Sequence, residues 1–158
     1  MARRYRLTFS AVTVAAAQDM VLVTGASGKM MLIRRAWVGC PDTTLATGQD
    51  LSLRARFLPA TLTVGSGGSV NQTPAKTDPG DATCSTATCG LNNTTKTTTS
   101  GTAIIVYSDG CHLFQGSNWR FDEPVPIGPS EAFVYEILGA PSGTVALSGG
   151  VEFDEIGG

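Results

Sequence analysis

Apolar and polar residues alternate along much of this chain with the period of two that is typical of β-strands. From 51 to 57 the odd positions are apolar and the even positions are polar, with Arg54 and Arg56 among the polar ones. From 4 to 9, arginine or threonine alternates with Tyr, Leu and Phe. Both stretches are therefore expected to form strands that bury one face and expose a polar face.

Other stretches have the composition of more deeply buried strands. Both faces of 30–40 are largely apolar, interrupted by two adjacent arginines. The run 103–108 (AIIVYS) is short and continuously apolar, which favours a central strand. Near the C-terminus the apolar positions keep one parity across Gly149 and Gly150, where a bulge or bend is expected.

The chain as a whole is expected to be all-β. No window combines a helical stripe of apolar residues with capping residues, and turns rich in Gly, Pro and Asp separate the strand-like runs. Many short strands at close spacing predict a single antiparallel β-sandwich over 1–158, of the jelly-roll type. All eleven aromatic residues lie outside 65–102, so the core is assigned to the remainder of the chain.

The segment 65–102 interrupts this pattern. It runs for 38 residues, of which 24 are Gly, Ser, Thr or Asn, and it contains no aromatic residue. A segment of this composition buries too little apolar surface to offset the entropy of ordering it. We therefore expect an inserted arm that a neighbouring subunit or a partner orders, and whose removal leaves the fold intact. Such an arm favours an interaction protein over an enzyme.

Charge is distributed unevenly, although the net charge is only −2. Residues 1–60 contain eight Arg or Lys and three Asp or Glu, which gives a net charge of +5. Residues 61–158 contain three Arg or Lys and ten Asp or Glu, which gives a net charge of −7. The overall balance argues against nucleic acid as a partner. This separation of charge would allow copies of the chain to stack head to tail or to dock on an oppositely charged shell. The alternative is that both charged regions are only solvated surface.

Arg54 and Arg56, with Arg34 beside them, are expected to form a basic stripe on one sheet face. Such a stripe would dock on an acidic surface, for example the solvated acidic strand 152–155 of a neighbouring copy. A polar outer face, with arginine stems lying over apolar surface, is the alternative. The sequence leaves both open.

Two motifs are similar to parts of enzymes, and neither is complete. The stretch 21–29 (VLVTGASGK) looks like the opening strand and glycine turn of short-chain dehydrogenases, but Met31 stands where a third glycine is needed and strand residues follow. A hairpin is therefore expected there. Cys111 and His112 are adjacent, whereas catalytic partners normally converge from separate elements. No catalytic residue and no enzymatic activity are predicted.

Four cysteines in a chain of this length do not make a disulfide scaffold. Cys84 and Cys89 could close a small ring in the arm, or all four could stay reduced. The paired spacing of a zinc ribbon is missing, so neither a metal nor another cofactor is predicted. No stretch is long and apolar enough to span a membrane. The N-terminus has the outline of a signal peptide, but its alternation predicts a first strand.

The small all-β domain, the N-terminal strand 3–9 (RRYRLTF) and an arm with Thr77–Asp81 and Asn92–Thr95 together resemble small virion proteins of tailed bacteriophages. Residues 124–135 are similar to the proline-rich turn before a late strand of viral jelly rolls. The class resembled most is the capsid decoration, or cement, proteins. This resemblance implies a homotrimer that binds the major capsid protein or other virion subunits at the capsid surface, after assembly in the host cytoplasm.

The residues expected to contact partners lie in the N-terminal strand, the basic stripe and the arm: Arg3, Arg4, Arg6, Arg34, Arg54, Arg56, Asn92 and Asn93. The alternative function is a receptor- or carbohydrate-binding module of a phage tail or spike. This alternative predicts an aromatic platform with polar neighbours at one loop end, around Trp119 and Arg120.

Overall fold

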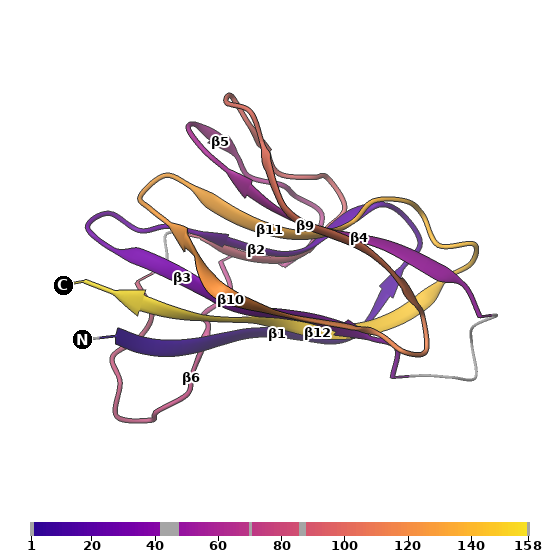
Figure 1. Cartoon of the computed structure of the whole chain (residues 1–158), viewed down its shortest axis with the longest axis horizontal. Coiled ribbons are helices and arrows are strands. Elements are labelled where there is room, and N and C mark those ends of the chain that lie inside the picture. Colours follow the sequence, from indigo (N-terminus) through magenta and orange to yellow (C-terminus); the bar gives the residue numbers. More distant parts are fainter. Residues whose placement is uncertain (1, 42–47, 70, 86–87, 158) are drawn as a thin grey trace.

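The computed structural model describes residues 2–41, 48–69, 71–85 and 88–157, which form strands, turns and loops without a helix. Two antiparallel sheets of five strands each pack face to face, and a two-stranded ribbon stands off the sandwich (Figure 1). The predicted all-β antiparallel sandwich is therefore confirmed. Its jelly-roll connectivity stays a prediction.

The two sheets draw strands from all parts of the chain. Sheet A has the order β10 (Ser117–Ile127), β3 (Met30–Gly39), β12 (Val145–Ile156), β1 (Ala2–Val14) and β6 (Ala75–Lys76). Sheet B has the order β7 (Cys89–Asn93), β2 (Gln18–Thr24), β11 (Ala132–Ile137), β4 (Asp50–Leu58) and β9 (Ile104–His112). The ribbon pairs β5 (Leu62–Thr63) with β8 (Thr98–Thr99).

The hydrophobic core lies between the sheets and is built from the inward positions of the alternating strands. Tyr5 of β1, Phe133 of β11 and Phe153 of β12 are among its fully buried side chains. Exposed and buried positions alternate along 4–9 of β1 and along 50–55 of β4, as the sequence predicts. The predicted N-terminal strand is thereby confirmed.

The first and last strands are neighbours in sheet A. They pair from Ala2 opposite Ile156 to Val14 opposite Val145, interrupted by one bulge (Figure 1). The start of β1 and the end of β12 therefore lie side by side at one end of the sheet.

The position of β9 differs from the prediction. The sequence predicts a central strand at 103–108, but β9 lies at the edge of sheet B, beyond β4. Its Ile104 and Ile105 are 54% and 56% exposed. A continuous apolar run does not distinguish a central strand from an apolar edge strand, because strand order is set by tertiary pairing.

The segment 65–102 is folded onto the sandwich and is not an extended arm. It supplies an edge strand to each sheet, because β6 pairs with β1 and β7 pairs with β2. Cys89 and Leu91 of β7 are buried in the main core. These contacts argue against the expectation that this segment can be removed without loss of the fold.

Glycine in this segment permits close packing of the backbone. A Cβ at Gly65 would lie 2.3 Å from the carbonyl oxygen of Thr95, and one at Gly68 would lie 2.2 Å from that of Leu91. The two stretches of backbone lie directly against each other and are joined by hydrogen bonds. The glycines of this segment, whose composition is typical of disorder, are therefore required for close backbone packing.

The bulge expected at Gly149 and Gly150 lies on a neighbouring strand instead. Here β12 runs straight through both glycines, while Ser10 and Ala11 of β1 together face one residue of β12. Glycine is needed because a Cβ at position 149 would lie 2.2 Å from the carbonyl oxygen of Trp37, and one at position 150 would lie 3.0 Å from its Cζ2. The Trp37 ring thus lies against the backbone of β12.

The replacement Leu91→Ala tests whether the segment 65–102 belongs to the cooperative fold. Leu91 is only 7% exposed and packs in the main core, so we expect the free energy of unfolding to fall by about 2–5 kcal/mol. Urea unfolding followed by tryptophan fluorescence measures the change. Thr95→Ala, at an exposed position of the same segment, is the control and should change it by less than about 0.5 kcal/mol. Negligible effects of both replacements would contradict this structural role.

Candidate functional site

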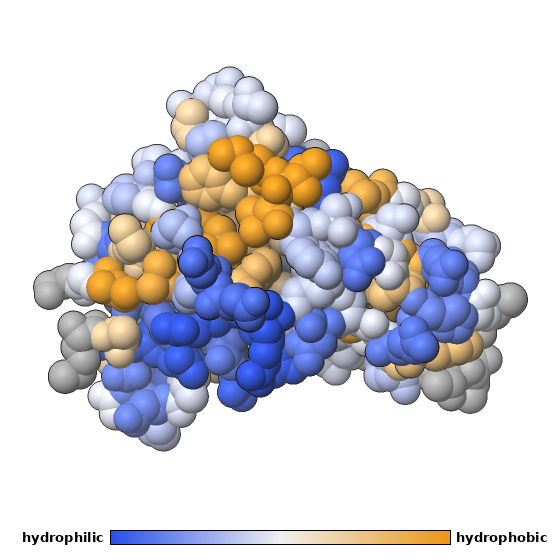
Figure 2. Space-filling view, in the orientation of Figure 1, coloured by the Kyte–Doolittle hydropathy of each residue, from blue (hydrophilic) through white to orange (hydrophobic). Residues whose placement is uncertain are grey.

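The outer face of sheet A carries five arginines, which we call the arginine face: Arg4 and Arg6 of β1, Arg34 and Arg35 of β3, and Arg120 of β10. Two carboxylates of β12 lie among them, those of Glu152 and Asp154. A hydrophilic area covers this part of sheet A in the lower centre of Figure 2. The arginines outnumber the carboxylates, so the surface keeps an excess of positive charge.

Three of these arginines are paired within the chain. Arg4 Nε donates a hydrogen bond to Asp154 Oδ1 at 2.9 Å, and this bond raises the pKa of Arg4. Arg6 Nε donates to Glu152 Oε2 at 2.8 Å, and Arg34 Nε donates to Asp154 Oδ2. The arginine stems are well exposed, so each pair contributes little stability, up to about 1 kcal/mol.

These pairs correct two expectations. The strand 152–155 is not solvated, because Asp154 and Glu155 are buried beneath the side chains that contact them. The basic stripe is also wrong, because Arg34 belongs to sheet A while Arg54 and Arg56 belong to sheet B. Parity along single strands does not show which sheet a strand joins.

Arg35 and Arg120 are different from the other three. Within the described part of the chain, no carboxylate oxygen lies within 4.0 Å of either guanidinium. Arg35 Nε donates a hydrogen bond to Asn118 Oδ1 at 2.7 Å, and its Cζ lies 4.9 Å from the centroid of the Trp37 ring. Parity alone does not identify these residues, because an irregularity at Arg34 and Arg35 shifts the buried positions of β3 from odd to even residues.

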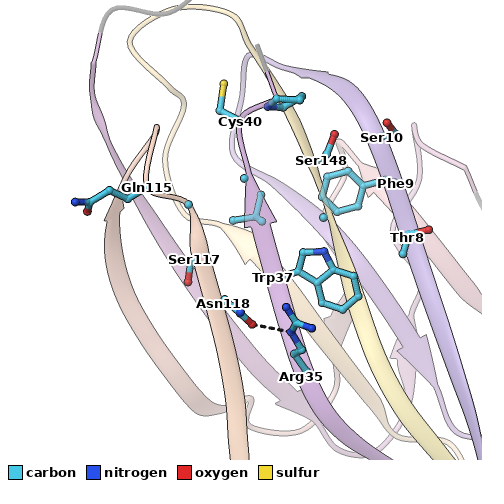
Figure 3. A pocket seen from close by; sticks show the side chains of 15 residues that line it. Thr8, Phe9, Ser10, Arg35, Trp37, Cys40, Gln115, Ser117, Asn118 and Ser148 are labelled. Atoms are coloured by element: carbon cyan, nitrogen blue, oxygen red, sulfur yellow. Dashed lines mark hydrogen bonds between the residues drawn. The ribbon is translucent and has the colours of Figure 1, made fainter. Parts of the chain in front are cut away.

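Two hollows open on the arginine face and share Arg35. The larger, of about 690 Å³, is lined by Trp37 together with Asn118 and several hydroxyl side chains (Figure 3). The smaller, of about 260 Å³, is lined by four of the arginines and by Phe121 and Glu152. The surface therefore joins a half-buried indole to a cationic hollow.

The aromatic platform expected at Trp119 is absent there. Trp119 is 6% exposed, and its ring packs 4.3 Å from that of Tyr107 and 5.0 Å from that of Tyr135. The partly exposed tryptophan is Trp37, on the neighbouring strand. Arg120, which follows Trp119 and points to the opposite side of β10, is exposed as expected.

The outer face of sheet B holds a buried ionic cluster around Glu136. Arg54 Nε and Arg56 Nε each lie 2.7 Å from Glu136 Oε1, and Lys96 Nζ lies 2.8 Å from Glu136 Oε2. Asp19 Oδ1 lies 3.6 Å from Arg56 Nη2. Both carboxylates are excluded from water, so this Glu136 cluster is an internal support and not a contact surface.

The segment 65–102 covers this cluster. The backbone amide of Thr97 donates to Asp19 Oδ2 at 2.6 Å, and the Thr97 hydroxyl accepts from the amide of Gly65 at 3.0 Å. Lys96 also donates to the carbonyl oxygen of Ile137. The cluster thereby ties the covering segment to three strands of sheet B.

The remaining predicted contact residues are dispersed. Asn93 is fully buried next to the Glu136 cluster, so it cannot contact a partner in this fold. Asn92 is half-buried with a positive φ of 57°. Arg3 lies 3.9 Å from Asp81. Asn93, which is buried, and Arg56, whose guanidinium is engaged by Glu136 and Asp19, are therefore corrections to the predicted contact residues.

The motifs similar to enzymes have structural roles. Residues 25–29 form the turn between β2 and β3, but these strands belong to different sheets and do not pair, so the predicted hairpin is wrong and only a turn between two strands is found. A Cβ at Gly25 would lie 1.9 Å from the carbonyl oxygen of Gly128. Burial raises the pKa of the Cys111 thiol, which disfavours the thiolate that a nucleophile requires.

The edge strand β9 presents a second exposed surface. Ile104, Ile105 and Tyr107 of β9 and Phe114 of the following turn are exposed, and we call them the apolar edge. Hydrophobic side chains gather over this part of β9 in the upper centre of Figure 2. Exposed apolar edge strands are sites of association, because their backbone groups also lack partners on one side.

Comparison with models of known protein families, with curated proteins and with solved structures finds no match to this chain. Across the described ranges there is no helix suited to crossing a membrane. The arginine face, the apolar edge and the Glu136 cluster are the structural features that bear on function.

The replacement Glu136→Gln tests the buried cluster. It removes the fully buried anion that three partly buried cations share, and is expected to lower the free energy of unfolding by about 1–3 kcal/mol. Equilibrium urea unfolding measures the loss. The exposed Glu123→Gln, which removes the same charge, should change stability by less than about 0.5 kcal/mol. Equal losses of stability from the two replacements would show that the cluster makes no specific contribution to stability.

Protonation of the Asp19 carboxyl is expected to make the stability of the protein depend on pH. Burial raises its pKa, and hydrogen bonds from Thr97 offset part of that shift. The folded protein then binds this proton more tightly than the unfolded chain, whose Asp pKa is about 3.9, so this contribution to stability falls as pH rises above about 3.9. The stability of the wild type minus that of Asp19→Asn should decrease over this range in urea titrations. A difference that rises with pH would contradict the assignment.

Proposed function

We propose that this chain is a capsid decoration, or cement, protein of a tailed bacteriophage, which acts as a homotrimer on the outside of the shell. The observation that carries the proposal is the apolar edge of β9. An edge strand with large exposed apolar side chains is a liability for a monomer, and natural proteins usually cover it. A second copy of the chain is the occupant we propose.

Self-association suits the chemistry of this edge. Ile104 and Ile105 occupy successive positions and so present apolar side chains on both faces of β9. A cyclic trimer places the same edge of each copy at one axis and removes it from water. Burial of apolar area stabilises such a contact by roughly 25 cal/mol per Å² of area removed from water.

The ribbon of β5 and β8 is the part proposed to reach the shell. It stands away from the sandwich (Figure 1) and is exposed at Thr98, Ser100 and Gly101. Three ribbons in one trimer would add weak contacts through avidity. A protein that binds the assembled shell and not its separate subunits stabilises the shell by mass action.

The replacement Ile105→Lys tests the trimer. Light scattering on a sizing column should give a trimer mass for the wild type and a monomer mass for the variant, because a lysine in each copy would place like charges at one axis. Thr144→Lys, at an exposed loop position, is the matched control and should remain trimeric. A monomeric wild type would contradict the proposal.

Binding to the shell is tested with particles of a phage that carries this coding sequence. Particles from which the gene has been deleted should lose their DNA at a lower temperature than intact particles. Added wild-type protein should restore the higher temperature, whereas Ile105→Lys should not. Absence of the chain from purified intact particles, measured by mass spectrometry, would overturn the assignment.

A further inference from the structure

We propose that the arginine face holds a binding site for an acidic saccharide. A sugar ring would stack on Trp37, and a carboxylate or sulfate of the same saccharide would lie between Arg35 and Arg120. This site uses the outer face of sheet A and does not depend on the trimer or on the shell.

Trp37 offers a preformed stacking surface. Its ring lies against β12 where Gly150 has no side chain, since a Cβ there would lie 3.0 Å from the indole. The ring is half-buried and faces the larger hollow (Figure 3). An aromatic ring held by backbone loses little entropy on binding, and its flat face suits the apolar side of a sugar ring.

The cationic part of the site follows from strand register. Arg120 lies directly opposite Arg35 in the pairing of β10 with β3, so two like charges are neighbours on one face. Like charges at this spacing are unfavourable. Glu152 of β12 is the other cross-strand neighbour of Arg35, but within the described part of the chain no carboxylate oxygen lies within 4.0 Å of either guanidinium. An anionic group placed between them would relieve the repulsion and accept charge-assisted hydrogen bonds.

The Asn118 side chain prepares Arg35 for this role. Its Oδ1 accepts the Nε hydrogen of Arg35 at 2.7 Å, which leaves the terminal nitrogens of the guanidinium to donate to a ligand (Figure 3). Arg35 also lies 4.9 Å from the Trp37 centroid, so the stacking surface and the anion site are adjacent. One ligand can therefore reach both.

The lining of the larger hollow favours a sugar over other polyanions. Hydroxyl side chains of β1 and β12 line the hollow beside Trp37: Thr8, Ser10 and Ser148. These groups both donate and accept hydrogen bonds, as sugar hydroxyls do. A nucleic acid would require a longer run of unpaired cations, whereas Arg4, Arg6 and Arg34 are already paired with carboxylates.

Isothermal titration calorimetry on the full chain tests the site with four probes. They are a polygalacturonate hexasaccharide, a heparin-derived hexasaccharide, the neutral maltohexaose and a short single-stranded DNA. We expect at least one acidic hexasaccharide to bind more tightly than maltohexaose and DNA. The better of the two acidic probes identifies the anionic group as a carboxylate or a sulfate.

Variants separate a built site from diffuse attraction. Trp37→Ala and Arg120→Gln should each weaken binding of the acidic hexasaccharide by about tenfold or more. Arg6→Gln removes one positive charge from the same face but lines neither hollow, so it should change binding by less than about twofold. Arg120 is exposed, so its variant keeps the test valid even if Trp37→Ala unfolds the protein.

Three results would overturn the proposal. The first is no binding of either acidic hexasaccharide. The second is equal weakening by Arg6→Gln and Arg120→Gln, with DNA bound as well as the sugars, which would indicate general attraction of polyanions. The third is binding of maltohexaose that equals that of the acidic probes and is unaffected by Arg120→Gln.

Discussion

The carboxylate of Glu136 is the interaction on which the covered side of the molecule depends. It is fully buried and pairs with three partly buried cations, one of which, Lys96, comes from the segment that covers sheet B. Because a buried charge is tolerated only with its partners, the covering segment has one favourable position. That position also places β7 beside β2 and so completes the edge of sheet B.

Arginine has different roles on the outer faces of the two sheets. Arg54 and Arg56 pair with the buried Glu136, and Arg56 also donates to the covering segment at Thr97, whereas the arginines of sheet A are more exposed. Only an uncovered arginine can meet a partner, and only one without a carboxylate neighbour keeps its full charge available. On the described surface, Arg35 and Arg120 are uncovered and have no carboxylate oxygen within 4.0 Å, although Glu152 is a cross-strand neighbour of Arg35.

Strand parity predicted what each strand buries, but not where each strand lies. The alternation along β1 and β4 follows directly from the sequence, because side chains of successive residues point to opposite faces. The edge position of β9 and the division of Arg34 from Arg54 and Arg56 depend on pairing between distant residues. The role of the glycines at 65–68 could not be predicted for the same reason, since the residues that approach them most closely, Leu91 to Thr95, lie 23 to 30 positions further along the chain.

The placement of the two ends at one end of the β1–β12 ladder determines how the fold responds to force. Ala2 and Ile156 face each other, so tension applied between them acts across the strands and not along them. Backbone hydrogen bonds of an antiparallel pair would then break one after another from the ends inward. The sandwich would peel open under a small load at its ends, whereas tension applied along its strands would have to shear many hydrogen bonds together.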